Sequence, residues 1–248
     1  MATALSEQTP TAPRLPLRLL CLHGHGGNAQ QFCSQLEDVF FKASTNSAAA
    51  EDVSFTCRCM SAPFPMQSQH SARRRWWRYD EGGNGDYPND WAEMEVAATR
   101  IAEELCAATK PYDGVLGMSQ GAEMVHTLAV LAHRGDPRFC GAHMPRFVIS
   151  LSGAVNPGLF ESPSGGGPPK GCEGPHAGPG PGRLALPCLF LADYQRDHWY
   201  PAGRWEGATN LYADCTVVEH AAGHTVPSLH SSGAALLKNF VRRSMKTK

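Results

Sequence analysis

A five-residue segment, Gly117-Met118-Ser119-Gln120-Gly121, carries the residue types that nucleophilic catalysis by serine requires. It matches G-x-S-x-G, a pattern in which a serine occupies a sharp turn between a strand and a helix. Glycines there let backbones approach too closely for a Cβ atom, and the amino end of the helix favours developing negative charge. An apolar run precedes the segment and a helical pattern follows it, so we predict that Ser119 is a nucleophile. The alternative is a glycine-rich turn that merely contains a serine.

A serine hydroxyl needs a base, and in proteins with this turn the chain order is serine, acid, then histidine near the C-terminus. His224 has that position, after an alternating run at residues 216–219, and Gly223 before it permits a tight turn. We predict that His224 is the base. His220 is the competing histidine, but it continues the strand, so we expect it to be structural or exposed.

The acid should follow the preceding strand, Pro187 to Leu191, and both Asp193 and Asp197 do so. A carboxylate at this point can accept the imidazole N–H and stabilise the imidazolium. We favour Asp197, because residues 197–201 read as the start of the next connection whereas Asp193 lies at the strand end. Asp193 remains the alternative, and Asp214 is more simply a turn residue.

Acyl transfer also needs hydrogen-bond donors for a tetrahedral oxyanion. The backbone N–H of Gln120, directly after the serine, supplies the first donor. A glycine-rich turn at residues 22–28 follows the first strong strand, and the N–H of His25 is our candidate for the second.

The same turn contains His23-x-His25, which could open the zinc motif H-x-H-x-D-H. Gly27 and Asn28 stand where that motif requires Asp and His. Cys57-x-Cys59 places two thiols on one face of a strand, which suits burial better than metal binding. We therefore expect no metal and no other cofactor.

Residues 73–78, with the sequence RRRWWR, could suggest nucleic-acid binding by stacking. The chain is close to neutral, with 22 Lys+Arg against 23 Asp+Glu, which argues against a polyanionic partner. We expect instead that Trp76 and Trp77 pack a loop over the sheet end and shape an apolar substrate pocket, with an arginine fixing the loop or meeting a substrate carboxylate.

Length and composition indicate one ordinary globular domain, since the chain has 248 residues, of which 42% are hydrophobic and 18% charged. Nine scattered cysteines, never spaced as CxxC, are typical of a reduced chain, so we expect a cytoplasmic protein, with the nucleus as a second location. No apolar run is long enough to span a membrane. Residues 1–16 lack an apolar stretch before a cleavage site and are interpreted as a disordered leader.

Apolar runs and helical periodicity alternate along the chain. The predicted strands are 17–22, 53–59, 114–117, 147–151, 187–191 and 216–219. Helical patterns start at Asn28 and cover 91–105, 120–133, 203–211 and a final stretch that carries residues 229–241, and Asp90 with Glu93 forms a capping box for the second. This alternation predicts an α/β domain over 17–243 with a mostly parallel sheet and helices on both faces. The Gly/Pro-rich residues at about 162–182 are therefore an insertion within it.

Beyond these separate signals, the chain resembles the FSH family of α/β-hydrolase serine hydrolases. The resemblance rests on residues 22–28, Arg75-x-Trp77, residues 113–122 (DGVLGMSQGA), residues 197–201 and Gly223-His224. It implies a single-domain α/β-hydrolase fold with Ser119, Asp197 and His224 as nucleophile, acid and base. It also implies hydrolysis of carboxylic esters, including acyl chains, without a metal.

The function predicted from the sequence is cleavage of a small-molecule ester or thioester through an acyl-serine intermediate. Two alternatives remain open: an acyltransferase that uses the same serine, and a non-catalytic binding protein on the same fold. We expect no nucleic-acid partner and no membrane span; the oligomeric state is not predicted.

Overall fold

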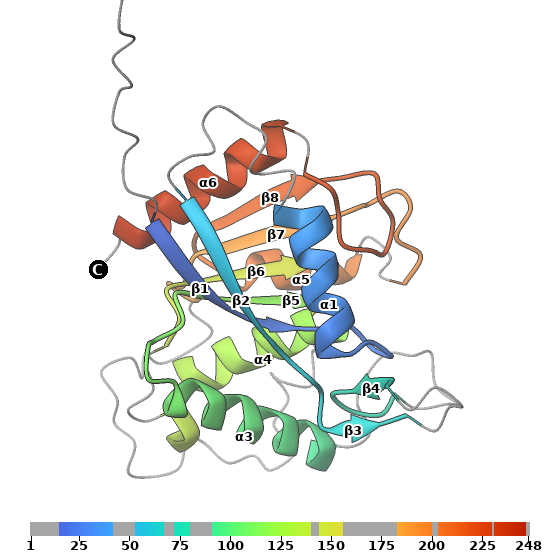
Figure 1. Ribbon diagram of the computed structural model, residues 1–248, viewed down its shortest axis with the longest axis vertical. Coiled ribbons are helices and arrows are strands. Elements are labelled where there is room, and N and C mark those ends of the chain that lie inside the picture. The colour runs from blue at the N-terminus through green and yellow to red at the C-terminus, as the bar shows by residue number, and fades with distance from the viewer. Residues whose placement is uncertain are drawn as a thin grey trace, which may run out of the picture.

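A single parallel sheet organises the protein. The computed structural model describes residues 15–41, 53–66, 72–79, 91–139, 144–155, 183–199, 203–229 and 231–246. Six strands pair in the order β2-β1-β5-β6-β7-β8, and every neighbouring pair is parallel (Figure 1). The strands are β1 (Leu15–Leu22), β2 (Val53–Met60), β5 (Gly114–Met118), β6 (Phe147–Leu151), β7 (Cys188–Ala192) and β8 (Cys215–Glu219).

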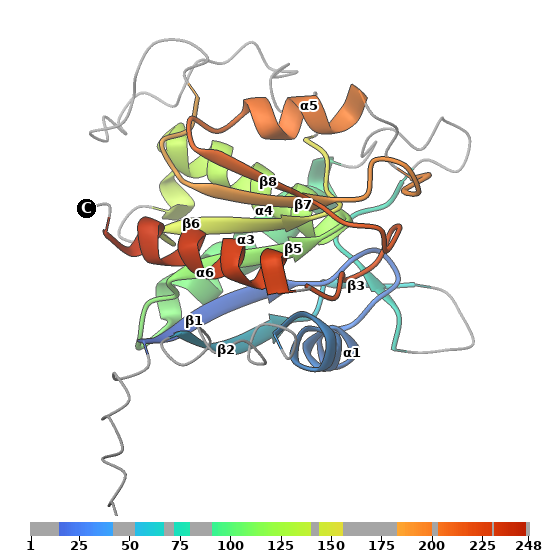
Figure 2. The same ribbon diagram turned by 90° about the horizontal axis from the view of Figure 1, so that it is seen from above.

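Helices cover both faces of this sheet (Figure 2). They are α1 (Ala29–Gln35), which continues as a π-helix (Leu36–Phe41), α3 (Trp91–Ala107), α4 (Gln120–His133), α5 (Gly203–Asn210) and α6 (Ser231–Lys246). Apolar residues of α3, α4 and α5 form one core layer, and those of α1 and α6 form the other. Successive strand residues point to opposite faces, so Leu20 lies in the first layer and Leu19 in the second. Burial on both faces explains why the central strands β5, β6 and β7 read as continuous apolar runs.

The structure confirms the predicted α/β class with a parallel sheet and helices on both faces. The predicted element boundaries need corrections at both ends of the domain. Strand β1 begins at Leu15, so the last two residues of the predicted leader belong to the sheet. The final helix begins at Ser231 and ends at Lys246, beyond the predicted domain end at 243. Leu229 precedes this helix; it is buried, which made its apolar side chain look like part of the helical pattern.

Two features were not predicted from the pattern. The helix that starts after Asn28 changes to π-helical geometry at Leu36, and two-residue strands β3 (Phe64–Pro65) and β4 (Arg74–Arg75) form a small antiparallel pair. Both are set by local backbone contacts, to which apolar periodicity is insensitive.

Some predictions fall outside the residues that the structure describes. These are the leader up to residue 14, the capping residue Asp90 and the insertion at 162–182. Among the described residues, no helix has the length and apolar character needed to cross a membrane.

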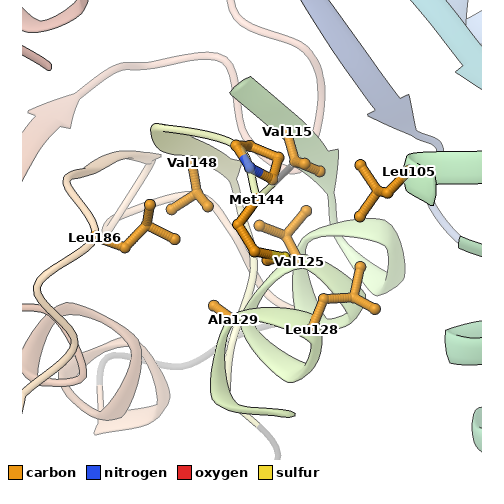
Figure 3. A pocket seen from close by; sticks show the side chains of 9 residues that line it. Leu105, Val115, Val125, Leu128, Ala129, Met144, Val148 and Leu186 are labelled. Atoms are coloured by element: carbon orange, nitrogen blue, oxygen red, sulfur yellow. The ribbon is translucent and has the colours of Figure 1, made fainter. Parts of the chain in front are cut away.

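The two ends of the sheet differ in chemistry. Because the strands are parallel, the loops after β1, β5, β7 and β8 meet at the carboxyl edge, where polar residues gather. Near the amino ends of β5 and β6 lies a small recess whose lining side chains are all apolar, including Leu105, Val125, Val148 and Leu186 (Figure 3). This recess offers no group for acid–base or nucleophilic chemistry, so the candidate site is the carboxyl edge.

Candidate active site

Ser119 occupies the sharp turn between β5 and α4. Its backbone has φ 52° and ψ −121°, a left-handed conformation that a non-glycine residue adopts at a cost of about 1–3 kcal/mol. A Cβ at Gly117 would lie 2.3 Å from the carbonyl oxygen of Gly121, and one at Gly121 would lie 2.1 Å from that of Leu22. Both positions therefore exclude any side chain. The Ser119 N–H donates to Leu151 O at 2.9 Å, which fixes the turn against β6.

Three side chains from separate loops form a continuous hydrogen-bonded chain. Ser119 Oγ lies 2.8 Å from Nε2 of His224, and Nδ1 of His224 lies 2.8 Å from Oδ2 of Asp197. The Asp197 side chain is only 1% exposed, whereas that of His224 is 18% exposed. The imidazole thus has a buried carboxylate on one side and the serine hydroxyl on the other, which is the geometry needed to take up a proton from the hydroxyl.

The second carboxylate of the acid loop, defined here as residues 193–199, serves a different purpose. Asp193 accepts backbone N–H groups from Gln195 (3.2 Å), Arg196 (3.0 Å) and Gly223 (2.7 Å). Burial alone would raise the pKa of Asp193, but the hydrogen bonds from Gly223, Arg196 and Gln195 lower it below its ordinary value. Asp193 therefore joins the acid loop to the residue before His224. Of the two candidate acids, only Asp197 is hydrogen-bonded to the imidazole.

The glycine-rich turn after β1 lies against Ser119. A Cβ at Gly24 would come within 3.3 Å of the Ser119 Cβ and 3.9 Å of its Oγ. Gly26, at φ 73°, donates its N–H to Arg74 O at 2.9 Å, which ties the turn to β4. His25 lies between these two glycines and is exposed to solvent. Gln120 is the first residue of α4, where a backbone N–H has no partner within the helix.

Trp76 and Trp77 are both fully buried, and hydrogen bonds lock their backbones to the turn that holds the nucleophile. The side chain of Gln120 accepts from the Trp76 N–H at 2.9 Å and donates to Trp77 O at 2.9 Å. Trp76 Nε1 donates to the His23 carbonyl at 2.7 Å. The pair thus ties its loop to the turns that carry His23 and Ser119. Contact between these indoles and a substrate stays a prediction.

His23 is a structural histidine in this arrangement. Its Nδ1 lies 2.7 Å from Gly24 O, and its Nε2 accepts the Ala62 N–H at 3.0 Å. Burial lowers the pKa of His23 to about 4, so the ring is neutral at physiological pH, with the proton on Nδ1. Both ring nitrogens are already engaged, and among the described residues no group of three or more His, Cys, Asp or Glu side chains could hold a metal ion.

The remaining predicted residues also have clear positions. His220 follows β8, is half-buried, and its Nδ1 accepts the Ala222 N–H at 3.2 Å, so it makes a turn. Asp214 is exposed and faces Arg243 at 3.4 Å. Cys57 and Cys59 are half-buried and pack against the core layer of α1 and α6.

Sequence reasoning missed two features, one at this edge and one in the interior of the fold. One is Trp199, an exposed indole beside His224, which the pattern of a loop could not distinguish from any other loop residue. The other is a buried polar network behind the sheet: His126 Nδ1 contacts Tyr212 OH at 2.7 Å and its Nε2 contacts Ser150 Oγ at 3.0 Å. The signal available in the sequence was a histidine, His126, within the helix predicted at 120–133.

A parallel sheet of this strand order, with a serine on the tight turn after β5 and a histidine after the last strand, defines an α/β-hydrolase. Comparison with protein families places the chain within this class: the family "Serine hydrolase (FSH1)" matches residues 14–235. The chain belongs to this family.

Curated relatives agree with that assignment, and solved structures share the fold. The chain is 27% identical to mouse "Esterase OVCA2" over 247 residues, covering 92% of this chain and 96% of the relative. It is 25% identical to "Esterase CG5412" of Drosophila melanogaster over 235 residues, covering 92% and 74%. Among solved structures, Zea mays acyl-protein thioesterase 2 superimposes with a TM-score of 0.60 at 18% identity, covering 94% of this chain and 97% of that one. At that identity the likeness concerns the fold.

Proposed function

We propose that this protein hydrolyses small-molecule carboxylic esters or thioesters through an acyl intermediate on Ser119. The observation that carries the proposal is the unbroken chain of hydrogen bonds from Ser119 Oγ through His224 to Asp197, with both distances at 2.8 Å. Membership of a serine hydrolase family and relatives named esterases support the same reaction class.

In this mechanism His224 Nε2 takes the Ser119 proton while Oγ attacks the ester carbonyl carbon. Asp197 holds the Nδ1 proton and stabilises the imidazolium that forms. His224 then gives its proton to the leaving oxygen or sulfur, and the acyl group remains on Ser119. A water molecule, deprotonated by His224, attacks this acyl-enzyme; return of the proton to Oγ releases the acid and regenerates Ser119.

The negative charge on the tetrahedral intermediate needs fixed donors. We assign these to the backbone N–H groups of Gln120 and His25. The first is an unpaired N–H at the amino end of α4, and the second belongs to the turn that touches Ser119 through Gly24. One such donor contributes about 3–4 kcal/mol to stabilisation of the transition state.

Free cysteines support a reducing compartment for this activity. All seven cysteines among the described residues are unpaired, and two of these, Cys21 and Cys188, are buried. We therefore propose a cytoplasmic location.

The experiment combines a fluorophosphonate probe with p-nitrophenyl esters of graded acyl length, on wild type and on Ser119→Ala. Wild type should gain one adduct by intact mass and release nitrophenol, whereas Ser119→Ala should do neither, with a loss of at least about a thousandfold in kcat/KM. A folded wild-type protein that is neither labelled nor active would refute the catalytic proposal and leave a binding protein on this fold. Adding alcohol or amine acceptors in the same assay tests whether the acyl group goes to water.

A second pair of variants tests the choice of acid. Asp197→Asn should lower kcat by about a thousandfold or more, because the imidazole loses the acceptor that fixes its tautomer. Asp193→Asn keeps an oxygen that can accept the Gly223 N–H and should retain much more activity. The reverse order of effects would assign the acid to Asp193.

A further inference from the structure

Trp199 combines high exposure with a position beside the candidate base. Its residue is 75% exposed, more than any other large hydrophobic residue among those described, and its ring centroid lies 6.2 Å from that of His224, tilted by 41°. An indole presents a large apolar surface whose hydration is unfavourable. A tryptophan left open to solvent beside reacting groups is a candidate contact for a ligand.

The position of Trp199 is fixed by the triad itself. Its backbone N–H donates to Oδ1 of Asp197 at 3.1 Å, while Oδ2 of the same carboxylate accepts from His224. One carboxylate therefore orients both the imidazole and the backbone of Trp199. This shared anchor holds the main chain of Trp199 at a set place relative to His224, and the indole extends from it.

Three other aromatic residues among those that the structure describes at this edge are already engaged in packing. Trp76 and Trp77 are fully buried, and Tyr194, on the same loop as Trp199, stacks on Trp205 with a centroid distance of 3.5 Å. Of these four aromatic residues, only Trp199 lies beside the His224 imidazole and leaves most of its surface open to a ligand.

Resting on the proposed function, we propose that Trp199 binds the leaving-group half of the substrate, and that it favours esters of flat, apolar alcohols such as aryl alcohols. The reason is the path of the proton. His224 Nε2 must deliver a proton to the leaving oxygen, so the leaving group lies next to the imidazole when the ester bond breaks. A solvent-open ring beside that imidazole meets the leaving group, and an aromatic leaving group can stack on it.

The test varies the alcohol while the acyl group stays constant. Acetate esters of 2-naphthol and of ethanol give the same acetyl-enzyme, so they differ only in acylation. Trp199→Ala should lower kcat/KM for 2-naphthyl acetate about fivefold to tenfold more than for ethyl acetate, as expected for loss of one aromatic contact. Trp199→Phe should restore most of the preference. Hydrolysis of the acetyl-enzyme, followed by intact mass, should change by no more than about twofold.

Tyr194→Ala is the matched control, because it removes an exposed aromatic ring from the same loop without touching His224. It should leave the ratio of the two kcat/KM values unchanged. The proposal is overturned if Trp199→Ala alters both esters equally, or if it slows deacylation as much as acylation, since either result means that the indole only shields the Asp197–His224 hydrogen bond.

Fluorophosphonate labelling separates this proposal from the one on which it rests. If wild type and Trp199→Ala are both labelled at Ser119 but show the same alcohol preference, only the role of Trp199 is wrong. If wild type is not labelled and has no ester turnover, the hydrolase function itself fails.

Discussion

Acidification should destabilise this protein through His126, a fully buried histidine on α4. Its two ring nitrogens contact Tyr212 OH at 2.7 Å and Ser150 Oγ at 3.0 Å, and burial lowers its pKa to about 3. A group whose folded-state pKa lies below its unfolded value binds protons more tightly when unfolded. The neutral His126 therefore contributes its full share to the free energy of unfolding above the unfolded-state pKa of about 6.5. This contribution is lost as the pH falls toward the folded-state pKa of about 3, because the unfolded chain takes up the proton first.

The magnitude follows from these two pKa values. Between about pH 7.5 and about pH 5 the unfolding free energy should fall by about 2 kcal/mol from His126, on the way to a total loss of about 5 kcal/mol at lower pH. His23, whose pKa is lowered to about 4, should contribute a further loss of about 2 kcal/mol over the same interval. Together these losses approach the whole stability of a marginal domain.

Urea unfolding at a series of pH values, for wild type and His126→Gln, measures this effect. The glutamine can hydrogen-bond but cannot titrate, so the variant should lose only about half of the stability that wild type loses over this pH interval. Ser150→Ala is the control: it removes a hydrogen-bond partner at a cost of about 1–3 kcal/mol but keeps the histidine, so its pH dependence should match that of wild type. Equal pH slopes for wild type and His126→Gln would refute the reasoning.

Three further predictions concern the turn and its neighbours. Gly121→Ala should prevent native folding, because the alanine Cβ would lie 2.1 Å from the Leu22 carbonyl oxygen. Gly207→Ala on α5 is the control: no atom lies within 4 Å of its Cβ, so it should be neutral or stabilising by up to about 1 kcal/mol. Thermal melts of both variants check this prediction. Asn28→Ala removes the side chain that caps α1 and should cost about 1 kcal/mol in urea unfolding, so an unchanged midpoint would contradict the capping role. Gln120→Leu leaves the two tryptophan backbone groups that it holds buried without partners and should cost about 2–5 kcal/mol in urea unfolding, so an unchanged midpoint would contradict this role.

The sequence alone was enough to predict that Ser119 lies on a sharp strand-to-helix turn, because such a turn imposes strict local demands. Two glycines around Ser119 and the change from an apolar run to a helical pattern are all local features. The structure supplies the reason for the glycines, since backbone from β1 and α4 fills the space where their side chains would be. The order of strands and helices was also predictable from local patterns, because burial on both faces leaves continuous apolar runs in the central strands and partial exposure leaves alternation at the edges.

The choice between the two candidate acids depended on tertiary structure. Asp193 and Asp197 have the same residue type and lie four residues apart after the same strand. Only the path of the acid loop brings Asp197 to the imidazole at 2.8 Å and directs Asp193 to the Gly223 N–H at 2.7 Å. Likewise, only the fold showed that Trp76 and Trp77 are buried while Trp199 is exposed.

Local rules of backbone geometry and burial therefore determined, from the sequence itself, which serine is placed on the turn, which histidine can follow the last strand, and which fold carries them. Contacts between segments distant in the chain decided which carboxylate is hydrogen-bonded to His224, which histidines are buried and neutral, and which indole is exposed to solvent. The physical reason is that these properties depend on desolvation and hydrogen bonding across loops, and a residue's neighbours in the sequence do not fix either one.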